Sequence, residues 1–164
     1  MARPKTIPDS KVHSAVLALL AANGEARLSF AAVGRACGLA PATLVQRFGS
    51  QNGMVVAALQ AGWDAADAAL SLAEKEAGKG AHQFLKALPN CAELLAGSRR
   101  DADLRARAAE WRRRAERVLA MRLGNGARAD QSAAMLYAIW QGQGDWKDAG
   151  GKGFRLKDAV KMLT

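Results

Sequence analysis

Apolar residues recur every three or four positions along nearly the whole chain, which is the spacing of one face of an α-helix. The strict alternation of apolar and polar residues that marks a half-buried strand is almost absent. The pattern therefore predicts an all-α protein. Its interruptions place the helices at 9–23, 29–37, 42–48, 51–77, 81–96, 101–123, 128–143 and 154–163.

Capping residues, glycines and prolines mark the ends of these helices. We expect Asp9 or Ser10 to cap the first helix and Ser29 the second, because their side chains can accept from free amide groups. Pro41 suits the first turn of the third helix, where its missing N–H costs nothing. Ser50 is expected to cap the long fourth helix, and Pro89 to kink or split the segment 81–96.

The first three helices have the arrangement of a helix-turn-helix, because two short helices meet at Gly38 and a third precedes them. In that motif the second short helix, here 42–48, enters the major groove, where base edges can be distinguished. A small core for such a unit is available from Phe30, Val33, Cys37, Leu39, Leu44 and Phe48.

The charge of the chain favours a polyanionic partner. Its 164 residues carry a net charge of +9, with a pI of about 10.2. One basic zone is 1–53, which includes an arm ending at Pro8. The other is 99–128, with ten arginines and four carboxylates. We expect a solvated helical face there, with the pairs Asp101–Arg105, Asp103–Arg107 and Glu110–Arg114, while a partner surface or an RNA-binding surface stays open.

Other classes of protein are disfavoured. No apolar run is long enough to span a bilayer and the first ten residues lack the apolar segment of a signal peptide, so we expect a soluble, cytoplasmic protein. Cys37 and Cys91 cannot build a disulfide framework or a four-ligand zinc site alone. His13 and His82 are isolated and no hydrolase or metalloprotease motif occurs, so we expect no catalytic site, no bound metal, no cofactor and no enzymatic activity.

Residues 28–59, LSFAAVGRACGLAPATLVQRFGSQNGMVVAAL, resemble the DNA-binding segment of TetR-family transcriptional repressors. The matching positions, at unbroken spacing, are Ser29, Ala32-Val33, Gly38-Leu39, Leu44, Phe48 and Ser50. The resemblance implies a DNA-binding domain over 1–49 and a helical effector-binding and dimerisation domain over 50–164, with 50–77 as the connecting helix.

The sequence departs from this family at four positions. Ala40 replaces the usual serine cap of the third helix, and Val45 replaces a phosphate-binding tyrosine. Arg47 stands where histidine is usual and can contact phosphate or guanine, whereas Gln51 replaces a lysine. These changes affect the contacts with DNA rather than the fold.

The resemblance predicts a ligand-responsive repressor that binds a palindromic operator as a homodimer. The alternative is a helical binding module of the same fold that has lost specific operator recognition. The residues expected to contact DNA are Arg3, Lys5, Ser29, Phe30, Pro41, Ala42, Thr43, Gln46, Arg47 and Gln51. A small-molecule effector is expected to contact Trp63, Phe84, Leu88, Trp111, Met121, Met135 and Trp140. The dimer interface is expected to include Met135, Leu136, Ile139, Phe154, Val160 and Leu163.

Overall fold

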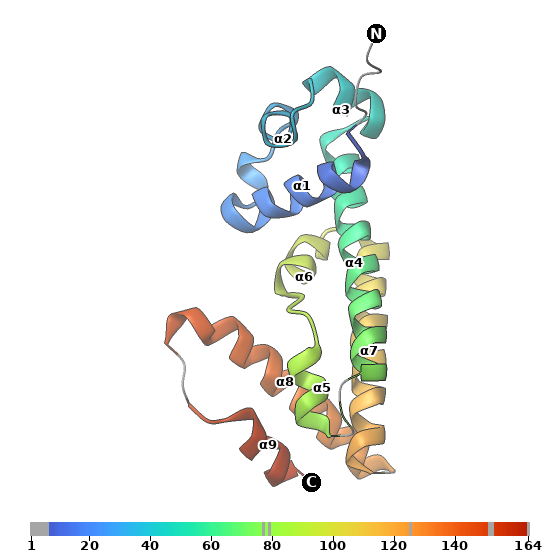
Figure 1. Ribbon diagram of the computed structural model, residues 1–164, viewed down its shortest axis with the longest axis vertical. Coiled ribbons are helices and arrows are strands. Elements are labelled where there is room, and N and C mark those ends of the chain that lie inside the picture. Colours follow the sequence, from blue (N-terminus) through green and yellow to red (C-terminus); the bar gives the residue numbers. More distant parts are fainter. Residues whose placement is uncertain (1–6, 77, 79, 125, 151–152, 164) are drawn as a thin grey trace. The chain divides into compact units, whose positions relative to one another are not determined.

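The computed structural model of the protein describes residues 7–76, 78, 80–124, 126–150 and 153–163 (Figure 1). This part of the chain is helical and contains no strand, so the all-α prediction is confirmed. None of its helices is long and apolar enough to cross a membrane. The helices are α1 (Asp9–Asn23), α2 (Phe30–Cys37), α3 (Pro41–Phe48), α4 (Gln51–Glu76), α5 (Ala81–Ala87), α6 (Ala92–Ser98), α7 (Ala102–Leu123), α8 (Ala127–Trp146) and α9 (Leu156–Leu163).

Most of the predicted helix ends are confirmed. The Ser29 hydroxyl accepts from the N–H of Ala32 at 3.1 Å, and the Ser50 hydroxyl accepts from the N–H of Gly53 at 3.0 Å. Pro41 is the first residue of α3. Pro89 lies between α5 and α6 and so splits the segment 81–96 into two helices. These signals act within a few residues, which is why the sequence is sufficient to locate them.

Two helix ends differ from the prediction. The residue that precedes α1 is Pro8, and neither Asp9 nor Ser10 caps the helix with its side chain. The Asp9 carboxylate accepts from the guanidinium of Arg47 instead, in α3. At the other end of the chain, α8 continues to Trp146, and Phe154 lies before α9 rather than inside it.

The chain packs into two compact units. Unit 1 contains the residues up to Ala65 and Glu93–Arg105, and unit 2 contains Ala66–Ala92 and the residues from Ala106 onward. Helices α1, α2 and α3 therefore belong to unit 1 together with most of α6, although the long helix α4 separates α6 from them in the sequence. Helices α4 and α7 contribute to both units.

The core of unit 1 is closed by tight contacts at two glycines. A Cβ at Gly62 of α4 would collide with the Leu94 side chain of α6, and a Cβ at Gly97 of α6 would lie 2.8 Å from the Leu59 side chain of α4. The indole N–H of buried Trp63 donates to the Ser98 hydroxyl at 3.0 Å. The absence of these two side chains lets α4 and α6 approach closely, and the hydrogen bond satisfies the buried indole.

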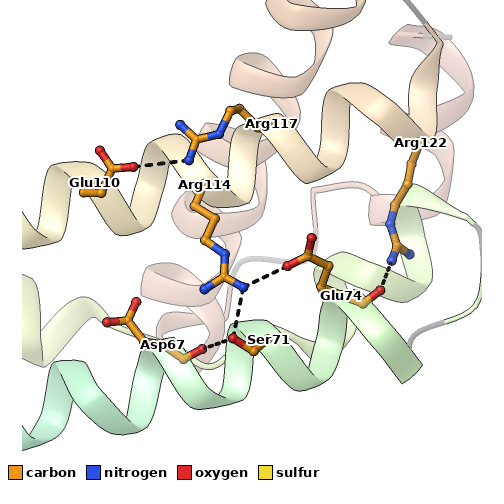
Figure 2. A network of polar contacts seen from close by, with 7 residues as sticks. All are labelled: Asp67, Ser71, Glu74, Glu110, Arg114, Arg117 and Arg122. Carbon is orange, nitrogen blue, oxygen red and sulfur yellow. Dashed lines mark hydrogen bonds and ion pairs between the residues drawn. The ribbon is translucent and has the colours of Figure 1, made fainter.

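In unit 2, α4 and α7 lie side by side and run in the same direction. Arg114 of α7 donates to the Ser71 hydroxyl at 2.9 Å and to the Glu74 carboxylate at 2.8 Å, both in α4 (Figure 2). About two turns before it Arg107 pairs with Asp67, and about two turns after it Arg122 donates to the Glu74 carbonyl. The partners in α4 follow the same order along the chain as the arginines of α7, which fixes the parallel direction.

Two of the salt bridges predicted within α7 are replaced by other contacts. Asp101 accepts from the N–H of Leu104 at 2.9 Å and so caps α7, and the Arg105 guanidinium donates to the carbonyl of Arg99. Glu110 accepts from Arg113 and Arg117 rather than from Arg114. Arginine side chains reach beyond one helical turn, so the carboxylates of α4 compete with the local acidic residues for them.

Candidate DNA-binding surface

The turn between α2 and α3 is determined by glycine. Gly38 ends α2 with φ +76°, a left-handed conformation that glycine adopts without strain. The N–H groups of Gly38 and Leu39 both donate to the carbonyl of Gly34, at 2.8 and 3.0 Å. A Cβ at Gly34 would lie 2.5 Å from the Leu39 carbonyl oxygen, so only glycine fits there. The turn thereby holds α3 at a defined angle to α2.

The outer face of α3 is open to solvent. Leu44 is fully buried in unit 1, and Pro41, Ala42 and Gln46 are exposed around the opposite side of the helix. Val45 is 45% exposed, which leaves an apolar side chain on this face. A short helix that buries one stripe and exposes the other has the shape needed for insertion into a major groove.

Arg47 lies at the edge of this face and is held by the start of α1. Its Nη1 donates to the Ile7 carbonyl at 2.8 Å and to the Asp9 carboxylate at 3.1 Å. Thr43, one turn before Arg47 on the same side of α3, is half-buried as well. Arg47, which is predicted to contact DNA, therefore lies beside the exposed face of α3 and also contacts the start of α1.

The other predicted DNA contacts lie around α3 or outside the described residues. Gln51 is exposed in the first turn of α4, directly after α3. Ser29 and Phe30, at the start of α2, are half-buried. Arg3 and Lys5 lie outside the described residues. Sequence reasoning missed Gly34 and Asp9, although a glycine in the middle of a short helix is itself a signal of close backbone approach.

The residues predicted to bind an effector fall into different surroundings. Trp63 is in unit 1 and the other six are in unit 2. Phe84, Leu88 and Trp111 are buried in the core, and Met121 is exposed beside a groove between α7 and the start of α8. Met135 is exposed on α8, while half-buried Trp140 lines a cleft of 730 Å³ with Phe154 and Lys147.

An aromatic cluster in unit 2 contains two of these residues. The ring of Tyr137 lies 6.3 Å from that of Trp111 and 5.6 Å from that of Trp140, centroid to centroid. The Arg112 guanidinium lies 5.4 Å from the centre of the Tyr137 ring. Burial, followed by the nearby Cys91, raises the pKa of Tyr137 to about 12. The phenol therefore stays neutral at physiological pH.

The predicted dimer residues are only partly accessible. Met135 and Phe154 are exposed, and Ile139, Val160 and Leu163 are half-buried. Leu136 is fully buried inside unit 2, so its side chain does not reach the surface where a second copy would bind. Sequence periodicity placed Leu136 on the apolar side of α8 but did not distinguish the inner part of that side from the outer part.

Comparisons with known proteins identify the fold. A TetR-like transcriptional regulator from Rhodococcus sp. RHA1 matches over 99% of this chain and 94% of its own, with TM-score 0.66 and 17% identity. A proposed transcriptional regulator from Saccharomonospora viridis, in complex with choline, matches over 94% of this chain and 92% of its own, with TM-score 0.68 and 18% identity.

A third solved structure is the multidrug binding protein EbrR complexed with imidazole. It matches over 99% of this chain and 95% of its own, with TM-score 0.61 and 19% identity. No protein-family model matches the sequence, and a search among curated proteins gives no significant match. The chain therefore has the fold of TetR-like transcriptional regulators along almost its whole length.

Proposed function

We propose that this chain, which has the fold of TetR-like regulators, is a DNA-binding transcriptional regulator whose α3 enters the major groove. The observation that carries the proposal is the solvent-open face of α3 in a helix-turn-helix whose first helix, α2, is capped by Ser29. Pro41, Ala42, Thr43 and Gln46 face base edges, and Arg47 and Gln51 face phosphates. Arg3 and Lys5 add positive charge from the segment before α1.

We further propose that the chain acts as a homodimer on a palindromic operator. A two-fold symmetric dimer places two copies of α3 about 34–36 Å apart, or a multiple of it, which matches successive major grooves. Selection from random duplex DNA followed by footprinting tests this proposal. The expected result is an inverted repeat with that spacing. Binding without sequence preference would contradict it.

Val45 and Gln51 stand where similar regulators usually have a phosphate-binding tyrosine and a lysine, so we expect few phosphate contacts. Each contact releases counterions, so the slope of log K against log salt is expected to be shallow for a regulator of this fold. Gln51→Lys should steepen this slope by about one unit per subunit. Val45→Tyr should tighten binding to selected and random duplexes alike, because phosphates carry no sequence information.

A small-molecule effector is proposed on two grounds. Two proteins of this fold are complexed with choline and with imidazole. The cleft of 730 Å³ beside Trp140 and Phe154 falls within the usual size range of small-molecule sites. An effector that lowers operator affinity would make the chain a ligand-responsive repressor. Operator binding measured with and without choline or imidazole is the first test.

The second candidate is a helical binding module that has lost operator recognition. Three features favour it: Val45 is apolar on the exposed face of α3, Ala40 gives α3 no side-chain cap, and Gln51 carries no charge. The test measures DNA affinity for Val45→Tyr, for Gln51→Lys and for deletion of residues 1–6, each in a separate variant. If all three changes leave DNA affinity unchanged, unit 1 is not a DNA-binding surface and this second candidate is correct.

A further inference from the structure

The guanidinium of Arg47 is held in one place by the chain around the start of α1. Nη1 donates to the Ile7 carbonyl at 2.8 Å and to the Asp9 carboxylate at 3.1 Å. These partners lie 40 and 38 positions away in the sequence, so the contact joins the end of α3 to the start of α1. The Arg47 side chain is 23% exposed, compared with 60% for Asp9.

The two contacts use only Nη1 of the guanidinium. An arginine side chain has five N–H donors, and Nη1 supplies two of them. The donors on Nη2 and Nε remain for another acceptor while the side chain stays attached to α1. A long side chain that is already fixed loses less conformational entropy when it binds a ligand.

We propose that Asp9 is a positioning residue for DNA recognition, which orients Arg47 so that its remaining donors meet a phosphate at the edge of the groove. The inference rests on the proposed function. It gives Asp9 a role that its charge alone does not suggest, because a carboxylate near DNA otherwise only repels the phosphates.

The two roles of Asp9 predict effects of opposite sign. If the carboxylate only repels DNA, Asp9→Asn removes a negative charge and tightens binding. If it orients Arg47, the same substitution replaces the ion pair by a weaker neutral contact, which loosens the side chain and weakens binding by about 3- to 10-fold, the cost of ordering one long side chain. The sign of the change therefore decides between them.

The experiment measures binding of the full chain to a duplex selected by the wild-type protein and to a random duplex. The variants are Asp9→Asn, Arg47→Ala and the double variant, with Asp103→Asn as the matched control. Asp103 is an exposed carboxylate in the first turn of α7, so its substitution changes the charge equally. Asp9→Glu keeps the carboxylate and should recover part of the lost affinity.

The expected result is weaker binding for Asp9→Asn, unchanged or slightly tighter binding for Asp103→Asn, and no further loss when Asp9→Asn is added to Arg47→Ala. Circular dichroism at the assay temperature checks that each variant is folded. Tighter binding by Asp9→Asn, or losses that add in the double variant, would overturn the inference. If the wild-type chain selects no sequence at all, the proposed function fails instead, so the two failures are distinguishable.

Discussion

Gly34 is the residue on which the geometry of the helix-turn-helix depends most directly. Its carbonyl accepts two N–H groups of the turn, and the space where a side chain would begin is filled by the Leu39 carbonyl. A backbone atom cannot rotate away as the end of a flexible side chain can. The direction in which α3 leaves the turn therefore depends on the absence of one methyl group.

We expect Gly34→Ala to lower the free energy of unfolding by about 1–3 kcal/mol, the usual cost of forcing an extra methyl group into a packed site. Gly144→Ala is the control, since Gly144 is also helical and the nearest atom outside the helix that a Cβ there would meet is Asn90 Nδ2, at the ordinary contact distance of 3.9 Å. That substitution should stabilise the protein by about 0.5–1 kcal/mol. Urea unfolding measures both, and equal effects would show that the Leu39 contact does not matter.

Cys91 is the second residue with an unusual environment. Burial, with a smaller effect from the Asp67 carboxylate, raises the pKa of its thiol to about 11. The thiolate, which is the reactive form, is therefore scarce at neutral pH. The burial that raises the pKa thus also protects the thiol from alkylation in the folded state.

Cys91 should accordingly react slowly with iodoacetamide at pH 8 in the native protein and rapidly after unfolding in urea. The pKa of this thiol is about 11 in the folded protein and about 8.5 in the unfolded chain, so the unfolded chain ionises first as the pH rises. The thiol's contribution to stability is therefore intact below about pH 8.5 and is lost as the pH rises from there toward 11. Cys91→Ala should reduce this alkaline loss. Mass spectrometry after alkylation measures the first effect, and urea unfolding at mildly alkaline pH measures the second.

At the scale of the elements, the sequence predicts the helices well because their signals are local. Ser29, Gly38 and Pro41 act on backbone groups within four positions, and all three lie where they were expected. The exposed side of α3 follows from the same periodicity. Contacts between helices are different, because Arg114 meets Glu74 at a separation of 40 positions that only the packing of α4 against α7 determines.

The contact between Asp9 and Arg47 was missed for the same reason. Asp9 is at the start of α1, where an aspartate commonly caps the helix. Nothing in the sequence around it indicates that its carboxylate pairs with Arg47 of α3 instead. Of the predicted site residues on α3, three are exposed and two, Thr43 and Arg47, are half-buried, and the contacts of Arg47 depend on the packing of unit 1. Local chemistry can thus be predicted from sequence, whereas the choice among distant partners requires the structure.

The arginines of α7 provide a test at this scale. Arg114 makes two hydrogen bonds to α4 and is about one-third exposed, whereas Arg113 pairs with Glu110 in its own helix and is more exposed. We expect Arg114→Ala to lower the free energy of unfolding by about 1 kcal/mol or more, and Arg113→Ala by less than about 0.5 kcal/mol. Urea unfolding measures both, and equal losses would mean that the contact between helices adds nothing.

At the scale of the whole molecule, α8 presents apolar side chains to solvent along one side. Met135 is 55% exposed and Trp146 is 66% exposed, and both lie on the same side of the helix as half-buried Ile139. A small residue, Gly142, lies between them, where another helix could approach closely. An exposed strip of this kind on a small domain favours association with a partner.

We expect a symmetric dimer that uses this strip of α8, and Met135→Asp should dissociate it and abolish operator binding. The substitution places a charge on an already exposed position, so it should leave the fold intact, whereas a charge at buried Leu136 would unfold unit 2. Leu72→Asp is the matched control, because Leu72 is 53% exposed but lies on α4. Sedimentation at micromolar concentration should show dimers for the wild-type chain and the control and monomers for Met135→Asp. If the wild-type chain is a monomer in solution but still binds an inverted repeat, two copies meet only on the DNA. The exposed strip of α8 would then have to bind a different partner.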